Sequence, residues 1–269
     1  MKRLFVYLIF AVTLAGRAVY CCEPVPPATP PPCAILYAHY KWNETAANTT
    51  VTDSSDNVRH KVYASGTAAS HTTTSAKVER ASRFSVSGED GTDRVFFGTT
   101  FFNDHITTGA EYCIAGWFRI DVSVTGKYLL AKDQNPRELL IYTSGNNIII
   151  RQRCPILIFA KTLTNGASDG LWHHIILQRT STQIEIWADG NLLGSSSAAG
   201  WDYSIESAAN MQIMWSVQGV IDDLRFFTRA LTTDEIVALY NSGAGTEDCF
   251  SEPQDEYPIF WGFGGMTGF

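Results

Sequence analysis

The sequence predicts an all-β domain that ends in one short helix, and three observations carry this prediction. Between residues 36 and 240, short runs of alternating apolar residues are separated by turn residues, as in β-sandwiches. Asp189-Gly190 is a strong hairpin signal, because a type I′ turn needs positive φ at both central residues. Near the end of this region, Thr232 and Glu235 have the spacing of a helix start.

The expected strands lie between turns along the body of the chain. The apolar pattern predicts strands over residues 112–120, 127–132, 138–142, 147–153, 172–179, 183–188, 211–215 and 220–227. Ser144-Gly145-Asn146 supplies the turn between two of them. The sequence therefore predicts one domain, over residues 34–242.

The expected helix begins at Thr232. Thr232 and Glu235 form a capping box, in which each side chain bonds the backbone N–H of the other residue. Gly243 is expected to end the helix in the left-handed conformation. The apolar face of the helix consists of Ile236, Val237, Leu239 and Tyr240.

The composition excludes several classes of protein. Of the 269 residues, 17% are charged, against a typical value of about 25%, and the net charge is −7. Nucleic-acid binders carry clustered Lys and Arg, and the sequence has no such cluster. With 45% hydrophobic and 12% aromatic residues, the chain can bury a core. A nucleic-acid binder, a coiled coil and a multi-span membrane protein are therefore excluded.

The N-terminus has the pattern of a signal peptide. Met1-Lys2-Arg3 precedes an apolar run over residues 4–15, which is too short to span about 30 Å of hydrocarbon as a helix. The small residues that follow predict cleavage after Ala18, so that residues 1–18 are removed; an uncleaved anchor is the alternative. We therefore expect a secreted, extracellular protein, made where cysteines form disulfides.

The segments beside the domain have unusual compositions. Residues 19–33 contain six of the ten prolines and predict a stiff Cys/Pro-rich spacer. Asn43 and Asn48 each begin a glycosylation sequon. Residues 243–269 form an acidic tail rich in glycine and aromatic residues, which either packs back on the domain or associates with another molecule.

The cysteines leave several pairings open. None of them sits in a C-x-x-C pair, so the sequence does not favour a zinc site. Cys113 and Cys154 lie in or beside expected strands and are a candidate disulfide pair. Cys21 and Cys22 are candidates for pairing with the same residues of a second chain, which would allow self-association.

Four motifs resemble those of laminin-G-like domains. Residues 170–176 (GLWHHII) resemble the G-x-W-H-H-V strand of that family, and residues 184–190 (IEIWADG) resemble its aromatic-x-D-G hairpin. Residues 219–232 (GVIDDLRFFTRALT) closely resemble its G-x-I-D-D-V-R-I-Y-x-R-A-L-S segment. Residues 53–55 follow the first strand as D-S-S-G does in the family, with Asp56 in place of the glycine. The resemblance implies a concanavalin A-like lectin/glucanase fold, a jelly roll of two antiparallel sheets.

The resemblance also implies a disulfide and a metal site. In this sandwich the chain ends lie near one another, which implies a Cys33–Cys249 disulfide. In the wider superfamily an aspartate equivalent to Asp222 often holds calcium, so Asp222, with Asp53 as a weaker candidate, predicts structural calcium. The alternative is that both carboxylates bond backbone groups.

The resemblance places ligands on the concave sheet face or on the loops at its rim. Trp201, Asp202 and Tyr203 lie in an expected loop, where an aromatic pair beside a carboxylate can stack on a sugar and bond its hydroxyls. The alternative is that these residues cover the core. Trp42 and Trp261 are weaker candidates for the same role.

Two further predictions concern the core. Trp117 and Trp172 fall at apolar positions of alternating strands and are expected to be buried. Ile221 and Leu224 are three residues apart, so a regular strand cannot turn both toward the core. A β-bulge at Asp222-Asp223 would restore that facing and re-aim one carboxylate.

The sequence carries no recognisable catalytic motif. Related glucanases use an E-x-D-x-x-E signature, which is absent here, and Glu185 and Asp189 lie four residues apart with Asp189 in a turn. No G-x-S-x-G occurs either. His173 and His174 are strand neighbours, so we expect one to face the core and one the solvent, where they cannot bind one ion together.

These observations predict a secreted, non-catalytic recognition domain that binds a glycan or an extracellular protein. A structural matrix component that assembles through its cysteines and aromatic tail is the alternative. A glucanase-type hydrolase is the weakest hypothesis.

Overall fold

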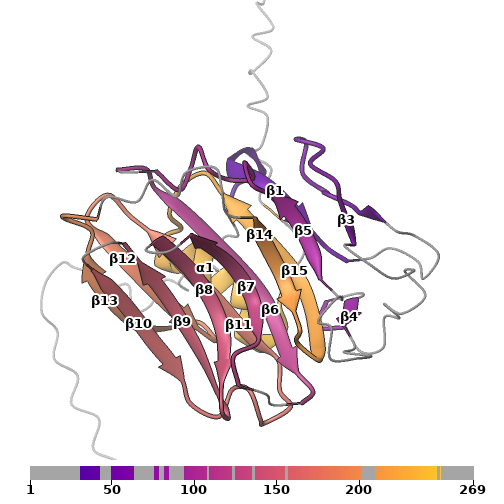
Figure 1. Ribbon diagram of the computed structural model, residues 1–269. Helices are drawn as coiled ribbons and strands as arrows, with labels where there is room; N and C mark the ends of the chain where they lie inside the picture. Colours follow the sequence, from indigo (N-terminus) through magenta and orange to yellow (C-terminus); the bar gives the residue numbers. More distant parts are fainter. Residues whose placement is uncertain are drawn as a thin grey trace, which may run out of the picture.

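The described part of the chain forms two antiparallel sheets that pack face to face. The computed structural model describes residues 31–42, 50–63, 76–78, 82–84, 94–107, 109–122, 125–134, 137–154, 157–201, 210–246 and 249. Helix α1 (Thr233–Tyr240) lies on the outer side of one sheet (Figure 1). The predicted all-β sandwich with one short helix is confirmed.

A seven-stranded sheet carries the helix. Its strand order is β1-β15-β6-β11-β12-β13, and β4 also pairs with β15. The strands are β1 (Leu36–Tyr40), β4 (Ser82–Phe84), β6 (Tyr112–Ile120), β11 (His173–Arg179), β12 (Gln183–Ala188), β13 (Asn191–Ser197) and β15 (Gly219–Phe227). A short 3₁₀ turn, η1 (Cys33–Ile35), leads into β1, and η3 (Asn241–Gly243) follows α1.

An eight-stranded sheet forms the other layer. Its order is β10-β9-β8-β7-β14-β5-β3-β2, so β14 inserts between strands that come much earlier in the chain. The strands are β2 (Thr50–Val51), β3 (Lys61–Tyr63), β5 (Val95–Gly98), β7 (Tyr128–Gln134), β8 (Arg137–Ser144), β9 (Asn147–Arg153), β10 (Ile158–Leu163) and β14 (Met211–Trp215).

The main core lies between the two sheets. Side chains at alternate positions of the strands enter it, because successive strand residues point to opposite faces. In β9, for example, Ile148 and Ile150 belong to the core while Ile149 between them is only half-buried. Aromatic rings in edge-to-face contact fill one part of it: Tyr40, Phe97, Phe101, Phe102 and Phe226.

Helix α1 covers the outer face of the seven-stranded sheet. Ile236 and Leu239 pack there on a second apolar cluster that includes Ile176 and Phe227. The capping box is confirmed, since Thr232 Oγ1 accepts from Glu235 N and Glu235 Oε2 accepts from Thr232 N.

The helix ends two residues earlier than the sequence predicts. Asn241, at φ 45°, is the left-handed cap, and its N–H bonds the carbonyl of Val237. Asparagine tolerates this conformation because its short polar side chain can bond locally. Its Nδ2 indeed donates to the carbonyl of Gly245 at 3.0 Å.

The predicted β-bulge in β15 is confirmed. The register between β15 and β6 shifts between Asp222 and Arg225, and Asp223 has φ 47°. Because of this extra residue, Ile221 and Leu224 both reach the main core.

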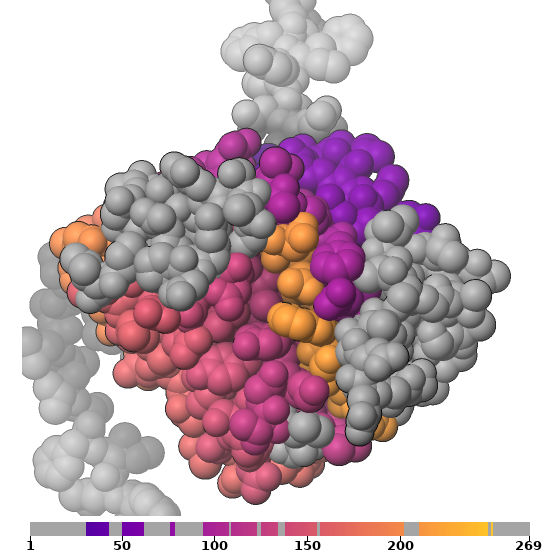
Figure 2. All heavy atoms as spheres, viewed as in Figure 1, coloured from indigo at the N-terminus to yellow at the C-terminus, as the bar shows by residue number. Residues whose placement is uncertain are grey.

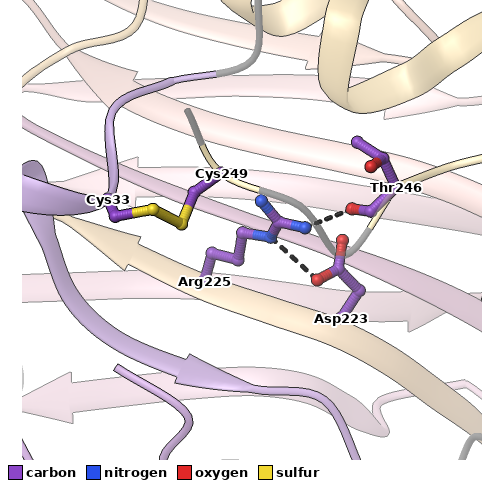
Figure 3. Close-up of a disulfide and its surroundings, with 5 residues drawn as sticks. All are labelled: Cys33, Asp223, Arg225, Thr246 and Cys249. Atoms are coloured by element: carbon purple, nitrogen blue, oxygen red, sulfur yellow. Dashed lines mark hydrogen bonds and ion pairs between the residues drawn. A yellow bond between two sulfur atoms is a disulfide. The ribbon is translucent and has the colours of Figure 1, made fainter. Parts of the chain in front are cut away.

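One predicted disulfide is present and the other is absent. Cys33 and Cys249 are bonded, across 216 positions of sequence (Figure 3). Cys113 and Cys154 are both free thiols, so their predicted pairing is wrong. Cys113 faces the helix side of the seven-stranded sheet, whereas Cys154 lies in the core between the sheets, and the backbone of a sheet separates them.

Two predictions near β11 also need correction. Trp117 is buried as expected, but Trp172 precedes β11 and is only half-buried, with the Arg119 guanidinium carbon 5.4 Å from its ring centroid. Neither histidine faces solvent, because both His173 and His174 are buried. His174 lies against Trp117 and Tyr240, under the helix.

Several predictions fall outside the described residues and stay predictions. These are the signal peptide, the Cys/Pro-rich spacer as far as residue 30, Cys21 and Cys22, the sequons at Asn43 and Asn48, and most of the tail, including Trp261. Among the described residues, no helix is long and apolar enough to cross a lipid bilayer.

Candidate ligand-binding face

The outer face of the eight-stranded sheet carries a row of half-buried aromatic side chains. Figure 2 looks onto this face, on which β10 and β9, β8 and β7, then β14 and β5 follow one another across the view. We call Tyr142, Tyr128, Trp215 and Phe96 the aromatic row. The Tyr128 ring lies 6.1 Å from Tyr142 and 5.2 Å from Trp215, measured between centroids, and is stacked on the latter.

Simple strand alternation places two members of the row. Leu139 and Ile141 point into the core from β8, so Tyr142 points outward. Val95 and Phe97 point into the core from β5, so Phe96 points outward. Both rings are half-buried.

Irregular backbone places the other two. Leu129 and Leu130 are neighbours and both enter the core, and the register between β7 and β8 shifts between Tyr128 and Leu130. This irregularity turns Tyr128 outward, opposite Tyr142. In β14, Met214 has φ 58° and enters the core, which leaves Trp215 half-buried opposite Tyr128.

Two arginines extend the row. The guanidinium carbon of Arg151, in β9, is 5.2 Å from the Tyr142 ring centroid. That of Arg94, just before β5, is 4.4 Å from Phe96 and 5.5 Å from Trp215. Such cation–π contacts hold a guanidinium plane in a fixed place.

Acidic groups on this face are already neutralised where they are buried. Glu138 forms an ion pair with Arg151 at 2.6 Å and accepts a hydrogen bond from Arg153 at 2.9 Å, and its side chain is 8% exposed. Asp133, opposite Glu138 in β7, also interacts electrostatically with both arginines, so two carboxylates balance two arginines in this part of the face.

A shallow pocket lies beside the Phe96 end of the row. It encloses about 520 Å³ and is lined by Thr50, His60, Lys61, Phe96, Phe97 and Gly98. Burial lowers the pKa of Lys61, and its ammonium lies 4.7 Å from the Phe101 ring centroid. His60 Nδ1 accepts from the backbone N–H of Asp53 at 3.0 Å, so its other ring nitrogen carries the hydrogen when the ring is neutral. The pocket thus adds hydroxyl, imidazole and ammonium groups to an aromatic wall.

The predicted ligand residues do not form this site. Trp201 is 3% exposed and belongs to the main core, so its ring cannot stack on a ligand. Asp202 and Tyr203 lie outside the described residues. Trp42 is also buried, at 1% exposed. The alternative interpretation, that Trp201 covers the core, is the one the structure supports.

The carboxylates proposed for calcium bond backbone N–H groups. Asp53 Oδ1 accepts from His39 N and Ser55 N, both at 2.9 Å, and its Oδ2 accepts from Arg59 N at 2.7 Å. Asp222 Oδ2 accepts from Lys77 N and Val78 N at 3.0 and 2.8 Å. In the described chain, no three His, Cys, Asp or Glu residues gather as a metal site. Backbone N–H donors thus occupy both oxygens of Asp53 and Oδ2 of Asp222, which favours the alternative of backbone bonding over calcium at these residues.

The carboxylates considered for catalysis are engaged in holding the fold. Glu185 Oε2 accepts from Gln178 Nε2 at 2.8 Å and from Trp187 Nε1 at 3.0 Å. Asp189 accepts from the backbone of His174 at 2.9 Å and bonds the His173 ring at 2.8 Å. Both carboxylates are therefore bonded to neighbouring groups of β11, β12 and the hairpin between β12 and β13.

The aromatic row could not be predicted as a group, because part of what aligns its side chains is not visible in the sequence. Tyr142 could have been found, since it alternates with the core residues Leu139 and Ile141. Trp215 lies two and four residues after the core residues Ile213 and Met211, so simple alternation along the strand would place it in the core. Only the left-handed residue at Met214 reverses that assignment.

Comparisons with known proteins agree with this architecture. No curated protein matches the sequence. The binding domain of Paraclostridial Mosquitocidal Protein 1 shares the fold with a TM-score of 0.62 and 14% identity, over 78% of this chain and 53% of that chain. A structure reporting that cell entry of botulinum neurotoxin type C depends on two ganglioside molecules gives 0.59 and 13%, over 78% and 51%. The chain thus spans about half the length of these two toxin chains.

A third similar structure is a single domain, and this chain covers almost the whole of it. Domain 4 of AbnA, an extracellular arabinanase from Geobacillus stearothermophilus in complex with arabinotriose, gives a TM-score of 0.57 and 14% identity, over 79% of this chain and 98% of that chain. A family model described as the concanavalin A-like lectin/glucanases superfamily matches residues 90–237, more than half of the chain. The chain therefore belongs to the concanavalin A-like lectin/glucanase superfamily.

Proposed function

We propose that the protein is a secreted, non-catalytic recognition domain that binds carbohydrate on the outer face of the eight-stranded sheet. The observation that carries this proposal is the aromatic row, in which Trp215 stacks on Tyr128 and remains half-buried at the surface. Aromatic rings present an apolar face to the C–H groups of a sugar, and polar groups beside them can bond its hydroxyls.

The structural neighbours support a binding role of this kind. One is bound to arabinotriose, another concerns gangliosides, and a third, a binding domain of botulinum neurotoxin DC, is in complex with synaptotagmin II. Because the last of these binds a protein, an extracellular protein is the second candidate ligand. The Cys33–Cys249 disulfide supports export to an oxidising compartment.

A glycan array with the full chain and two tryptophan variants tests the proposal. Trp215→Ala removes the centre of the aromatic row and is expected to abolish glycan binding. Trp172→Ala is the matched control, since Trp172 is also half-buried and also contacts an arginine, but lies by the other sheet. We expect the control to bind as the unchanged protein does.

Two readouts make the result decisive. Thermal unfolding must show that both variants are folded, and the array is repeated with a calcium chelator, which we expect to change nothing because Asp53 and Asp222 bond backbone N–H groups. Binding that survives Trp215→Ala would contradict the proposed face. Binding of a protein partner and of no glycan would replace carbohydrate by protein as the ligand class.

A further inference from the structure

Arg94 carries a positive charge at one end of the aromatic row. Its side chain is half-buried, and its guanidinium lies against both Phe96 and Trp215. Its Nε is buried without a hydrogen-bond partner, and in the described part of the chain the guanidinium has no ion pair. Buried donors are normally bonded, so this group lacks an acceptor that something else must supply.

Other arginines of the chain show what Arg94 lacks. Arg229 bonds Glu235 through both terminal nitrogens, at 2.8 and 2.6 Å, and Arg225 bonds Asp223 at 2.8 Å. On the binding face itself, Arg151 and Arg153 share Glu138. Arg94 instead lies over two aromatic rings, Phe96 and Trp215, which fix the position of its donors without neutralising its charge.

We propose that the glycan bound by the aromatic row is acidic and that Arg94 receives its carboxylate or sulfate group. This inference rests on the proposed function. A guanidinium presents a planar fork of N–H donors that matches the two oxygens of a carboxylate or sulfate, and such charge-assisted bonds are about twice as strong as neutral ones. With its charged group on Arg94, a sugar would have Trp215 and Tyr128 beside it as a stacking surface.

Arg94 favours an anionic ligand over a neutral one because the other cations near the row are already engaged. Arg151, at the opposite end, forms an ion pair with Glu138. The Lys61 ammonium lies over Phe97 and Phe101, which belong to the core on the other side of the sheet. A carboxylate or sulfate would supply the counter-charge that Arg94 lacks among the described residues, and a neutral ligand would not.

The aromatic row favours a glycan over an acidic polypeptide. The four rings, from Tyr142 to Phe96, lie across successive strands β8, β7, β14 and β5 rather than along one strand. A row of rings spaced in this way offers successive stacking positions to a chain of sugar rings. An acidic polypeptide is therefore included in the test as the competing ligand.

The experiment compares neutral, carboxylated and sulfated glycans for the full chain. An array of neutral, uronate-bearing, sialylated and sulfated oligosaccharides identifies the tightest neutral and acidic members, and their dissociation constants are then measured in solution with poly-glutamate as an added probe. Arg94→Gln removes the charge but keeps most of the stem. Arg119→Gln is the matched control, since Arg119 lies over Trp172 by the other sheet.

We expect an acidic glycan to bind more tightly than a neutral one and its affinity to fall as salt is raised. Arg94→Gln is expected to lower the acidic-to-neutral selectivity about tenfold or more, whereas Arg119→Gln leaves it unchanged. Arg94→Lys keeps the charge without the fork and should recover only part of the loss. The sulfated and carboxylated arms then show which of the two groups Arg94 prefers.

The possible failures are distinguishable. If Trp215→Ala abolishes binding but Arg94→Gln leaves the selectivity intact, the glycan face stands and the acidic ligand is wrong. If Trp215→Ala changes nothing or no glycan binds, the proposed function and this inference both fail. Binding of poly-glutamate that depends on Arg94, without binding of any acidic glycan, overturns the inference in favour of a protein partner.

Discussion

His174 shows how a polar residue of the sequence becomes part of the protein interior. Burial, the largest influence, lowers its pKa from the usual 6.5 to about 4. Its Nδ1 has no hydrogen-bond partner within the described chain, and its ring packs against Trp117 and Tyr240, which also stack on each other. The residue therefore acts as a neutral aromatic ring that fills the space under the helix.

This burial predicts acid lability. Between pH 6.5 and about 4 the unfolded chain binds a proton at His174 that the folded protein does not, so stability falls as the pH falls through this window. The full shift corresponds to roughly 3 kcal/mol at one residue. Urea unfolding measured at pH 7 and pH 4.5 is expected to show a large loss at the lower pH.

A variant isolates this residue from other acid-sensitive groups. His174→Phe keeps a ring against Trp117 and Tyr240 and removes the titration, so the loss between pH 7 and pH 4.5 should shrink. His39, whose pKa burial lowers, and the carboxyls of Asp223 and Glu235, whose pKa values their arginine partners lower against burial, remain in both proteins and contribute to the residual slope. An unchanged loss in the variant would show that His174 is not the group responsible.

Alkylation can test that Cys113 and Cys154 are free thiols and do not form a disulfide. Cys113 and Cys154 are buried, and burial raises the pKa of the Cys113 thiol well above its ordinary value, so neither is expected to react in the folded protein. Alkylation without reductant, followed by peptide mass spectrometry, should modify both only after denaturation. A disulfide-linked peptide that contains both residues would restore the original prediction.

At the scale of elements, long alternating segments were predictable and short ones were not. The strands at 112–120, 147–153, 183–188 and 211–215 agree with the sequence prediction residue for residue. The sequence analysis did not identify β2 to β5, β10 or β13. Strands of two to four residues carry too little alternation to be recognised, and β13 is a largely exposed edge strand with serines at its end.

The aromatic row marks the same limit for the site. Alternation fixes which side chains face the core when a strand is regular, as in β8 and β9. Tyr128 and Trp215 depend on irregular backbone near Leu129 and at Met214, which forms only when the two sheets pack. The aromatic residues of the row are evident in the sequence, but the sequence does not show that they share the outer face of one sheet.

The capping box at Thr232 predicts a measurable loss of stability. Thr232→Ala removes the hydroxyl that accepts from Glu235 N, and a lost N-cap of this kind costs about 1 kcal/mol. Thr233→Ala is the matched control, because Thr233 is exposed in the first turn and does not cap. Equal midpoints of urea unfolding in the two variants would contradict the role of the cap.

At the scale of the whole molecule, a second set of contacts lies beside the disulfide that joins the two ends of the described chain. Arg225 donates to the carbonyl of Thr246 and to Asp223 Oδ1, while neutral His39 shares the same carboxylate oxygen at 2.6 Å (Figure 3). Burial and the nearby Arg225 lower the pKa of His39, so this contact is a hydrogen bond rather than an ion pair. The disulfide ties the segment after α1 to the turn before β1, and the Arg225 contacts tie it to the bulge of β15.

The disulfide is expected to stabilise the fold chiefly by restricting the unfolded chain. It closes a loop over a sequence separation of 216, for which the chain-entropy model gives up to about 5 kcal/mol. Cys33→Ser/Cys249→Ser should therefore unfold at a lower urea concentration, with Arg225 and Asp223 still in place. Because the two sheets and their core do not depend on the bond, the variant should keep its glycan binding when it is folded. Reductant should destabilise the unchanged protein and leave the variant unaffected, and a loss in both would show that reduction acts elsewhere.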